Sequence, residues 1–170
     1  MTRLFARILP LLSAALLLGA CGIYSFSGTS IQNDVDTINI DYFEYRAEKV
    51  NPSLSSDLTE ALRTRFRRMT RLEQVEQDGD LEITGEVTGY NVSAAAITAD
   101  EVAARNRLTV TVRVNFTNRK YPEDDFDAKS FSAYAEFDSD LTLDAVEGDL
   151  CTEIVDKLIE EIFNATVAQW

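Results

Sequence analysis

The strongest constraint on the fold is a run of ten residues, 108–117, in which apolar and polar side chains alternate without interruption. Alternation with a period of two places the two sets of side chains on opposite faces of a β-strand. Valine recurs in the apolar set, and its β-branched side chain favours strands. The run therefore predicts a strand in a sheet whose apolar face must be covered and whose polar face can meet water. The apolar set is Leu108, Val110, Val112, Val114 and Phe116.

The rest of the chain supplies further strands and two helices. Shorter alternating stretches at residues 37–43, 81–88 and 130–137 predict three more strands. Apolar residues recur with helical spacing over residues 54–69 and again over residues 146–167, so each segment predicts a helix with one apolar face.

Local signals mark where both helices begin. Asn51 followed by Pro52 is typical of a helix start, and Asp144 with Glu147 three residues later resembles a capping box. The order of elements is then strand–helix–strand–strand–strand–helix. It predicts an α+β fold, a two-layer sandwich in which two helices pack on one face of a four-stranded, mostly antiparallel sheet.

The N-terminus has the composition of an export signal. Arg3 and Arg7 precede an apolar stretch, residues 8–18, which is too short to span a bilayer as a permanent helix. The sequence Leu18-Gly19-Ala20-Cys21 resembles the bacterial lipobox, in which the cysteine is lipidated and becomes the new N-terminus. An ordinary secretory signal with an incidental cysteine is the alternative. We predict a signal peptide over residues 1–20 and lipidation at Cys21.

The lipid sets the expected location and domain organisation. Two or more acyl chains anchor a protein stably, whereas a single chain binds only marginally. Gly22 follows the cysteine in place of an aspartate that would signal retention in the inner membrane, so the outer membrane is expected. Residues 21–34, rich in Ser, Gly and Asn, are interpreted as a lipid-anchored tether and residues 35–170 as a single α+β domain. Cys151 has no second cysteine left to pair with.

Composition excludes several functions. The chain has a net charge of −13, and removal of Arg3 and Arg7 with the leader makes it more negative. This charge argues against nucleic-acid partners and against a broad attraction to anionic lipid. The absence of histidine excludes Ser–His and Cys–His catalysis. No metal site, cofactor or catalytic residue is predicted, and only a carboxylate-only enzyme remains as a remote alternative.

One charged cluster stands out on the first helix. Acids lie early in this helix and bases late, which complements the helix dipole. The interpretation we favour is a solvated helix end matched to the dipole, and the alternative is a binding patch. The bases are Arg63, Arg65, Arg67, Arg68 and Arg71.

Several blocks of the sequence, taken together, resemble one known family. From the lipobox onward the chain is similar to the LPS-assembly lipoprotein LptE, in the form found in Bacteroidetes-type bacteria. The order of the blocks and the anchor are more specific than any block alone. The blocks are residues 21–28, 85–90, 106–118 and 131–135.

The resemblance implies a function without a catalytic group. LptE-like proteins are outer-membrane lipoproteins that sit inside the β-barrel LptD, help it assemble and assist delivery of lipopolysaccharide to the cell surface. Basic residues near one end of the sheet contact lipopolysaccharide in relatives. Arg113, Arg119 and Lys120 are the candidates here, chosen by location only. Another envelope binding module, such as a lipid carrier or a scaffold, is the competing interpretation.

Overall fold

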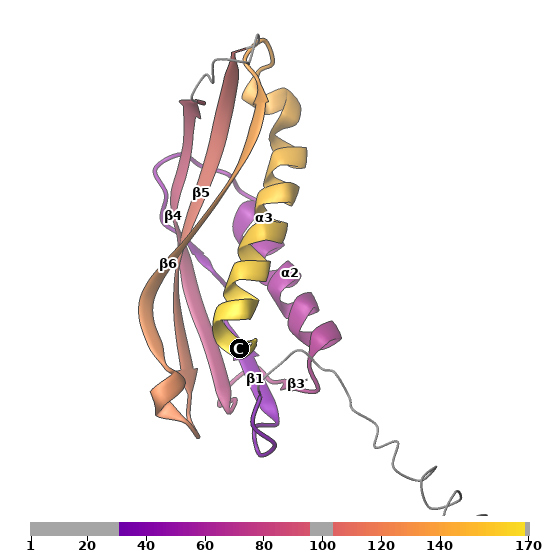
Figure 1. Ribbon diagram of the computed structural model, residues 1–170, viewed down its shortest axis with the longest axis vertical. Helices are drawn as coiled ribbons and strands as arrows, with labels where there is room; N and C mark the ends of the chain where they lie inside the picture. The colour runs from indigo at the N-terminus through magenta and orange to yellow at the C-terminus, as the bar shows by residue number, and fades with distance from the viewer. Residues whose placement is uncertain (1–30, 96–103, 169–170) are drawn as a thin grey trace, which may run out of the picture.

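The computed structural model describes residues 31–95 and 104–168 (Figure 1). The predicted leader, Cys21 and most of the predicted tether therefore lie outside the described residues. Each predicted strand and helix has a counterpart in the structure. The elements in chain order are β1 (Thr37–Ile40), β2 (Glu44–Tyr45), α2 (Leu54–Met69), β3 (Glu73–Gln74), β4 (Leu81–Ala94), β5 (Arg105–Asn118), the 3-10 turn η1 (Pro122–Asp124), β6 (Phe126–Asp138) and α3 (Leu143–Val167).

The sheet has six strands, so the prediction of four is wrong. The main order is β3-β1-β4-β5-β6, and β2 pairs with β4 farther along the same strand. The two strands missed, β2 and β3, are two residues long, which is too short to display an alternating pattern.

The sheet is mixed: its long strands pair antiparallel, as predicted, and its short strands pair in parallel. Strands β4, β5 and β6 form an antiparallel meander. Strand β1 pairs in parallel with β3 and β4, and β2 also pairs in parallel with β4. The reason is the position of α2 between β1 and β4, because two strands joined through a helical crossover run in the same direction.

The core lies between the sheet and the helices. Helix α3 contacts β6 and β5, and α2 contacts α3, β1 and β3; in Figure 1 both helices lie to one side of the sheet. The Phe66 and Phe163 rings meet edge to face with centroids 5.0 Å apart, which joins α2 to α3. A Cβ on Gly85 would lie 2.4 Å from the Phe43 ring, so the missing side chain leaves the space that this buried ring occupies. None of the described helices is both long enough and apolar enough to cross a bilayer.

The two helix starts differ from each other. The Asn51 side-chain oxygen accepts the backbone N–H of Leu54 at 3.1 Å, so the predicted capping residue acts from just outside α2. The predicted capping box of α3 does not form, because α3 begins at Leu143 after Thr142 without a side-chain cap. Glu147 instead accepts hydrogen bonds from residues distant in sequence, as described below.

Candidate functional site

The end of the predicted tether is held against the domain. The Arg71 guanidinium donates to the backbone carbonyl of Gln32 at 2.7 Å and to that of Val35 at 3.2 Å. On the opposite side, Lys120 donates to the carbonyl of Asp34. The chain therefore enters the domain between the end of α2 and the loop that follows β5.

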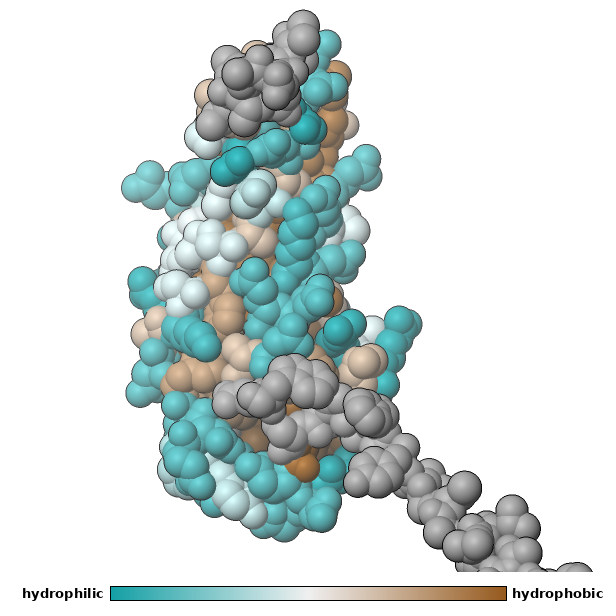
Figure 2. All heavy atoms as spheres, in the orientation of Figure 1, coloured by the Kyte–Doolittle hydropathy of each residue, from teal (hydrophilic) through white to brown (hydrophobic). Residues whose placement is uncertain are grey.

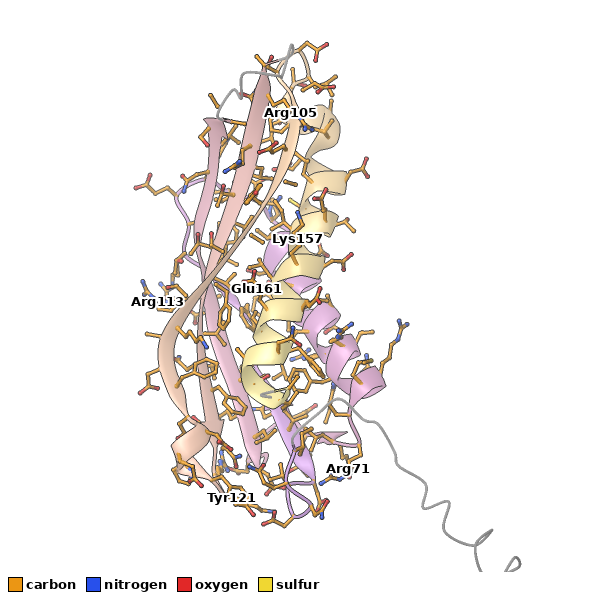
Figure 3. The ribbon with its side chains drawn as sticks, in the orientation of Figure 1. Arg71, Arg105, Arg113, Tyr121, Lys157 and Glu161 are labelled. Carbon is orange, nitrogen blue, oxygen red and sulfur yellow. The ribbon has the colours of Figure 1, made fainter. Side chains whose placement is uncertain are left out.

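Arg113, the first candidate for lipopolysaccharide contact, lies in the middle of β5 on the polar face of the sheet. Its Nη1 is 2.9 Å from Glu86 Oε1 on the neighbouring strand. Figure 3 shows Arg113 on the side of the sheet away from α3. It borders a shallow pocket of 260 Å³ that also includes Asp41, Glu44 and Glu86, so the surroundings of this cation are acidic.

Arg119, the second candidate, lies just after β5 at the end of the sheet. Its two terminal nitrogens are each 3.0 Å from a carboxylate oxygen, one of Asp78 and one of Glu82. These hydrogen bonds raise the pKa of the Arg119 guanidinium. Figure 2 shows hydrophilic side chains covering this end of the molecule.

Lys120, the third candidate, pairs with a carboxylate that also holds the start of β1. Lys120 Nζ is 3.1 Å from Asp80 Oδ1. The other oxygen of Asp80 accepts the backbone N–H groups of Asp36 at 2.8 Å and Thr37 at 3.1 Å. The N–H of Asp36 is the main cause of a pKa lowered to about 2 for Asp80, and Lys120 adds to it.

The three candidates do not form one cluster. Arg119 follows Arg113 by six residues in an extended chain, a separation of about 20 Å. Arg119 and Lys120 lie at one end of the sheet, whereas Arg113 lies in its middle. Each is already paired with a carboxylate, so an anionic ligand would have to compete with these pairs.

A buried polar cluster, which no pattern in the sequence predicts, lies beside the start of α2. The Tyr90 hydroxyl donates to Glu147 Oε1, and the Asn51 side-chain nitrogen lies 3.3 Å from the same oxygen. Asn51 also lies 3.6 Å from the Cys151 sulfur. Burial and the bond to Glu147 raise the pKa of Tyr90, and burial raises the pKa of the Cys151 thiol. The cluster therefore keeps a protonated phenol and an inert thiol beside one carboxylate.

The cluster borders a groove of 640 Å³ between the N-terminal halves of α2 and α3. The residues of the cluster come from three parts of the chain, so no local spacing in the sequence predicts it. Four carboxylates line the groove, and they disfavour an anionic occupant. In the part of the chain that the structure describes, His, Cys, Asp and Glu side chains form no group able to hold a metal ion. The four carboxylates are Asp57, Glu60, Glu147 and Asp156.

These features define a small α+β domain in which two helices accompany a mixed sheet with an ion-paired polar face. The family model named LptE, described as lipopolysaccharide-assembly, matches residues 35–166. The match spans nearly all of the described domain, and the chain therefore belongs to the LptE family.

The solved structures to which this chain is similar have little sequence identity to it. A hypothetical protein from Chlamydia trachomatis is 9% identical, with 77% of this chain and 97% of that chain covered and a TM-score of 0.52. A minor lipoprotein from Acinetobacter baumannii is 14% identical, with 71% and 89% covered and a TM-score of 0.42. Lipoprotein B from Nitrosomonas europaea is 12% identical, with 78% and 85% covered and a TM-score of 0.45. No curated protein sequence matches the chain.

Proposed function

We propose that this protein is an outer-membrane lipoprotein that plugs an LptD-type β-barrel, helps it assemble and assists transport of lipopolysaccharide to the cell surface. The observation that carries the proposal is the LptE family match over residues 35–166. The role requires binding surfaces and no catalytic group, so the protein is proposed not to be an enzyme.

The polar face of the sheet supports a place inside a barrel. The lumen of an outer-membrane barrel is polar, and a plug must present charges there without leaving them unpaired. On this face Arg107 lies 2.6 Å from Glu136, and Arg113 pairs with Glu86. Charges that are already paired can face a polar lumen at little further cost.

Isolation of the complex tests the function. The tagged chain, extracted from native membranes in mild detergent, should recover one outer-membrane barrel in a fixed ratio, identified by mass spectrometry. Recovery of a different envelope complex, or of a lipid without a barrel, would support the scaffold or carrier alternative. Absence of any barrel partner would contradict the proposed function.

The lipid anchor is a separate part of the proposal. The intact mass of the mature protein should correspond to a chain that begins at Cys21 and carries acyl groups. A Cys21→Ala form should be released from the membrane, apart from any fraction that the barrel retains. If the Cys21→Ala form fractionates fully with the outer membrane in cells that lack the barrel, the lipid is not the anchor.

Contact of lipopolysaccharide with Arg113, Arg119 and Lys120 stays a prediction. Phosphate groups would have to displace carboxylates such as Asp78 and Asp80 from the same cations. Replacing all three cations with glutamine should weaken lipopolysaccharide binding and leave barrel association nearly intact. Equal lipopolysaccharide binding by the parent and the triple variant would refute this site.

A further inference from the structure

The cations of this domain divide sharply into paired and unpaired groups. Most of those on the sheet, and two on the helices, lie within ion-pair distance of a carboxylate. Four arginines at the end of α2 and just beyond it have no ion-pair partner among residues 31–95 and 104–168. Lys49 and Lys129 also lack an ion-pair partner in these ranges, but neither has a second unpaired cation near it in the sequence. The paired cations are Arg46, Arg63, Arg105, Arg107, Arg113, Arg119, Lys120 and Lys157.

We call the unpaired group, together with the methionine inside it, the α2 patch: Arg65, Arg67, Arg68, Met69 and Arg71. Three of its four arginines contact neutral groups. Arg67 donates to the hydroxyl of Thr64 at 3.1 Å, Arg71 donates to backbone carbonyls, and the Arg65 guanidinium carbon lies 5.2 Å from the Phe163 ring centroid. These contacts position three guanidinium groups, and no carboxylate of residues 31–95 or 104–168 lies within ion-pair distance of them. Figure 2 shows hydrophilic side chains projecting where α2 ends.

The patch also contains an apolar side chain that is not packed in the core. Met69 is 48% exposed, although it lies between arginines on both sides in the sequence. The helix dipole accounts for basic residues in the last turn, but it accounts neither for an exposed methionine nor for Arg71, which lies beyond the helix. Cations that surround an exposed apolar side chain are typical of surfaces that lie in a membrane interface.

The patch is close to the predicted anchor along the chain. Arg71 holds Gln32, which follows Cys21 by eleven residues, and eleven extended residues span at most about 40 Å. A lipid on Cys21 would therefore keep the end of α2 within that distance of the membrane surface. The rest of the domain is strongly acidic, so an anionic surface would attract this end and repel the others.

From these observations we infer that the α2 patch docks on the headgroups of an anionic phospholipid bilayer and orients the domain on the membrane that carries its anchor. The inference rests on the anchoring part of the proposed function. The contact is electrostatic and local, because charges farther than about 8 Å from the surface are screened at physiological salt.

Vesicle binding tests the docking without the acyl chains. The mature chain, starting at residue 21 with Cys21→Ser, keeps the buried core, which begins at Val35. It should bind phosphatidylcholine vesicles that contain phosphatidylglycerol and should not bind vesicles of phosphatidylcholine alone. Each arginine near an anionic surface contributes roughly fivefold in affinity, so Arg67→Gln with Arg68→Gln should weaken binding by about 25-fold.

A matched control removes the same charge from the other end of the molecule. Arg105→Gln with Arg107→Gln removes two cations that are paired with Glu136, and Figure 3 shows Arg105 at the end opposite Arg71. This double variant should keep the parent's affinity for the vesicles. Replacing Arg67 and Arg68 with lysine should restore most of the binding, because the attraction needs charge and no fixed geometry. The thermal midpoint of each variant establishes that it is folded.

The inference would be overturned if the Arg67→Gln/Arg68→Gln variant bound the vesicles as tightly as the parent, or if the parent bound both kinds of vesicle equally. It would also be overturned if the Arg105→Gln/Arg107→Gln control lost as much affinity as the Arg67→Gln/Arg68→Gln variant. A variant that loses affinity for lipopolysaccharide but keeps it for phosphatidylglycerol would also overturn it and assign the patch to that glycolipid. If Cys21 is not lipidated, the result is different. The native protein would then lack the mass of the acyl groups, but the Cys21→Ser chain would still bind the phosphatidylglycerol vesicles.

Discussion

Asp80 links the start of β1 to the loop before β4, and its loss should be measurable as a change in pH-dependent stability. Its carboxylate accepts the N–H groups of Asp36 and Thr37 and pairs with Lys120. In Asp80→Asn the side chain keeps its shape but loses its charge. The amide can accept fewer of these bonds, so β1 is held less tightly.

The magnitude follows from the lowered pKa. The Asp80 pKa falls from 3.8 to about 2 on folding, and each pKa unit corresponds to about 1.4 kcal/mol. The carboxyl is partly exposed to solvent, which reduces the effect, so we expect Asp80→Asn to cost about 1–2 kcal/mol at neutral pH. Because the folded pKa is the lower one, this stability is fully present above pH 3.8 and is lost as the pH falls towards 2.

Urea unfolding of the parent and of Asp80→Asn, measured at several pH values, checks this reasoning. The difference in unfolding free energy should be constant between about pH 7 and pH 5 and should narrow below about pH 4, as both chains come to carry a neutral side chain. Parallel pH profiles with a constant gap down to the lowest pH would refute the assigned cause. A gap of zero at neutral pH would show that the Asp80 contacts contribute nothing.

Three further substitutions probe the packing, each measured by chemical unfolding. Leu158 is fully buried on α3, so Leu158→Ala should cost about 2–5 kcal/mol, and a loss below about 0.5 kcal/mol would remove this residue from the core. Gly85→Ala should cost about 1–3 kcal/mol, because the new Cβ would overlap the buried Phe43 ring; an unchanged stability would mean that the ring moves aside freely. Tyr90→Phe should cost about 1–3 kcal/mol, because Glu147 loses a hydrogen-bond donor; a neutral result would show that solvent replaces the phenol.

The sequence predicted the long elements well because each carries its own periodicity. The run at residues 108–117 is the centre of β5, and the helical spacing after Asn51 gives α2. The parallel pairing of β1 was not predicted, because it follows from the crossover through α2 and not from the strand's own residues. Strands as short as β2 have no period to detect.

The candidate site was less predictable than the fold because its chemistry depends on pairing between distant residues. Arg113 has a carboxylate partner only because β4 places Glu86 opposite it. Glu147 has the spacing of a capping box, yet contacts from Tyr90 and Asn51 determine its role. The local sequence indicated only that the arginines on α2 lie at the end of a helix. The structure distinguishes them from most other cations, because they have no carboxylate partner among the described residues.

The short parallel strands have a mechanical consequence for a chain held by its N-terminus. Any pull transmitted along the chain reaches first the bonds of Arg71 and Lys120 to the entering backbone, then the four residues of β1. Both strands are paired on both edges, but β5 is fourteen residues long and pairs along most of its length with β4 and β6, whereas β1 pairs only briefly with β3 and β4. The domain should therefore yield by separation of β1 from β3 and β4 while the antiparallel meander stays folded. Amide hydrogen exchange should show the same order, with protection lost in β1 well before β5.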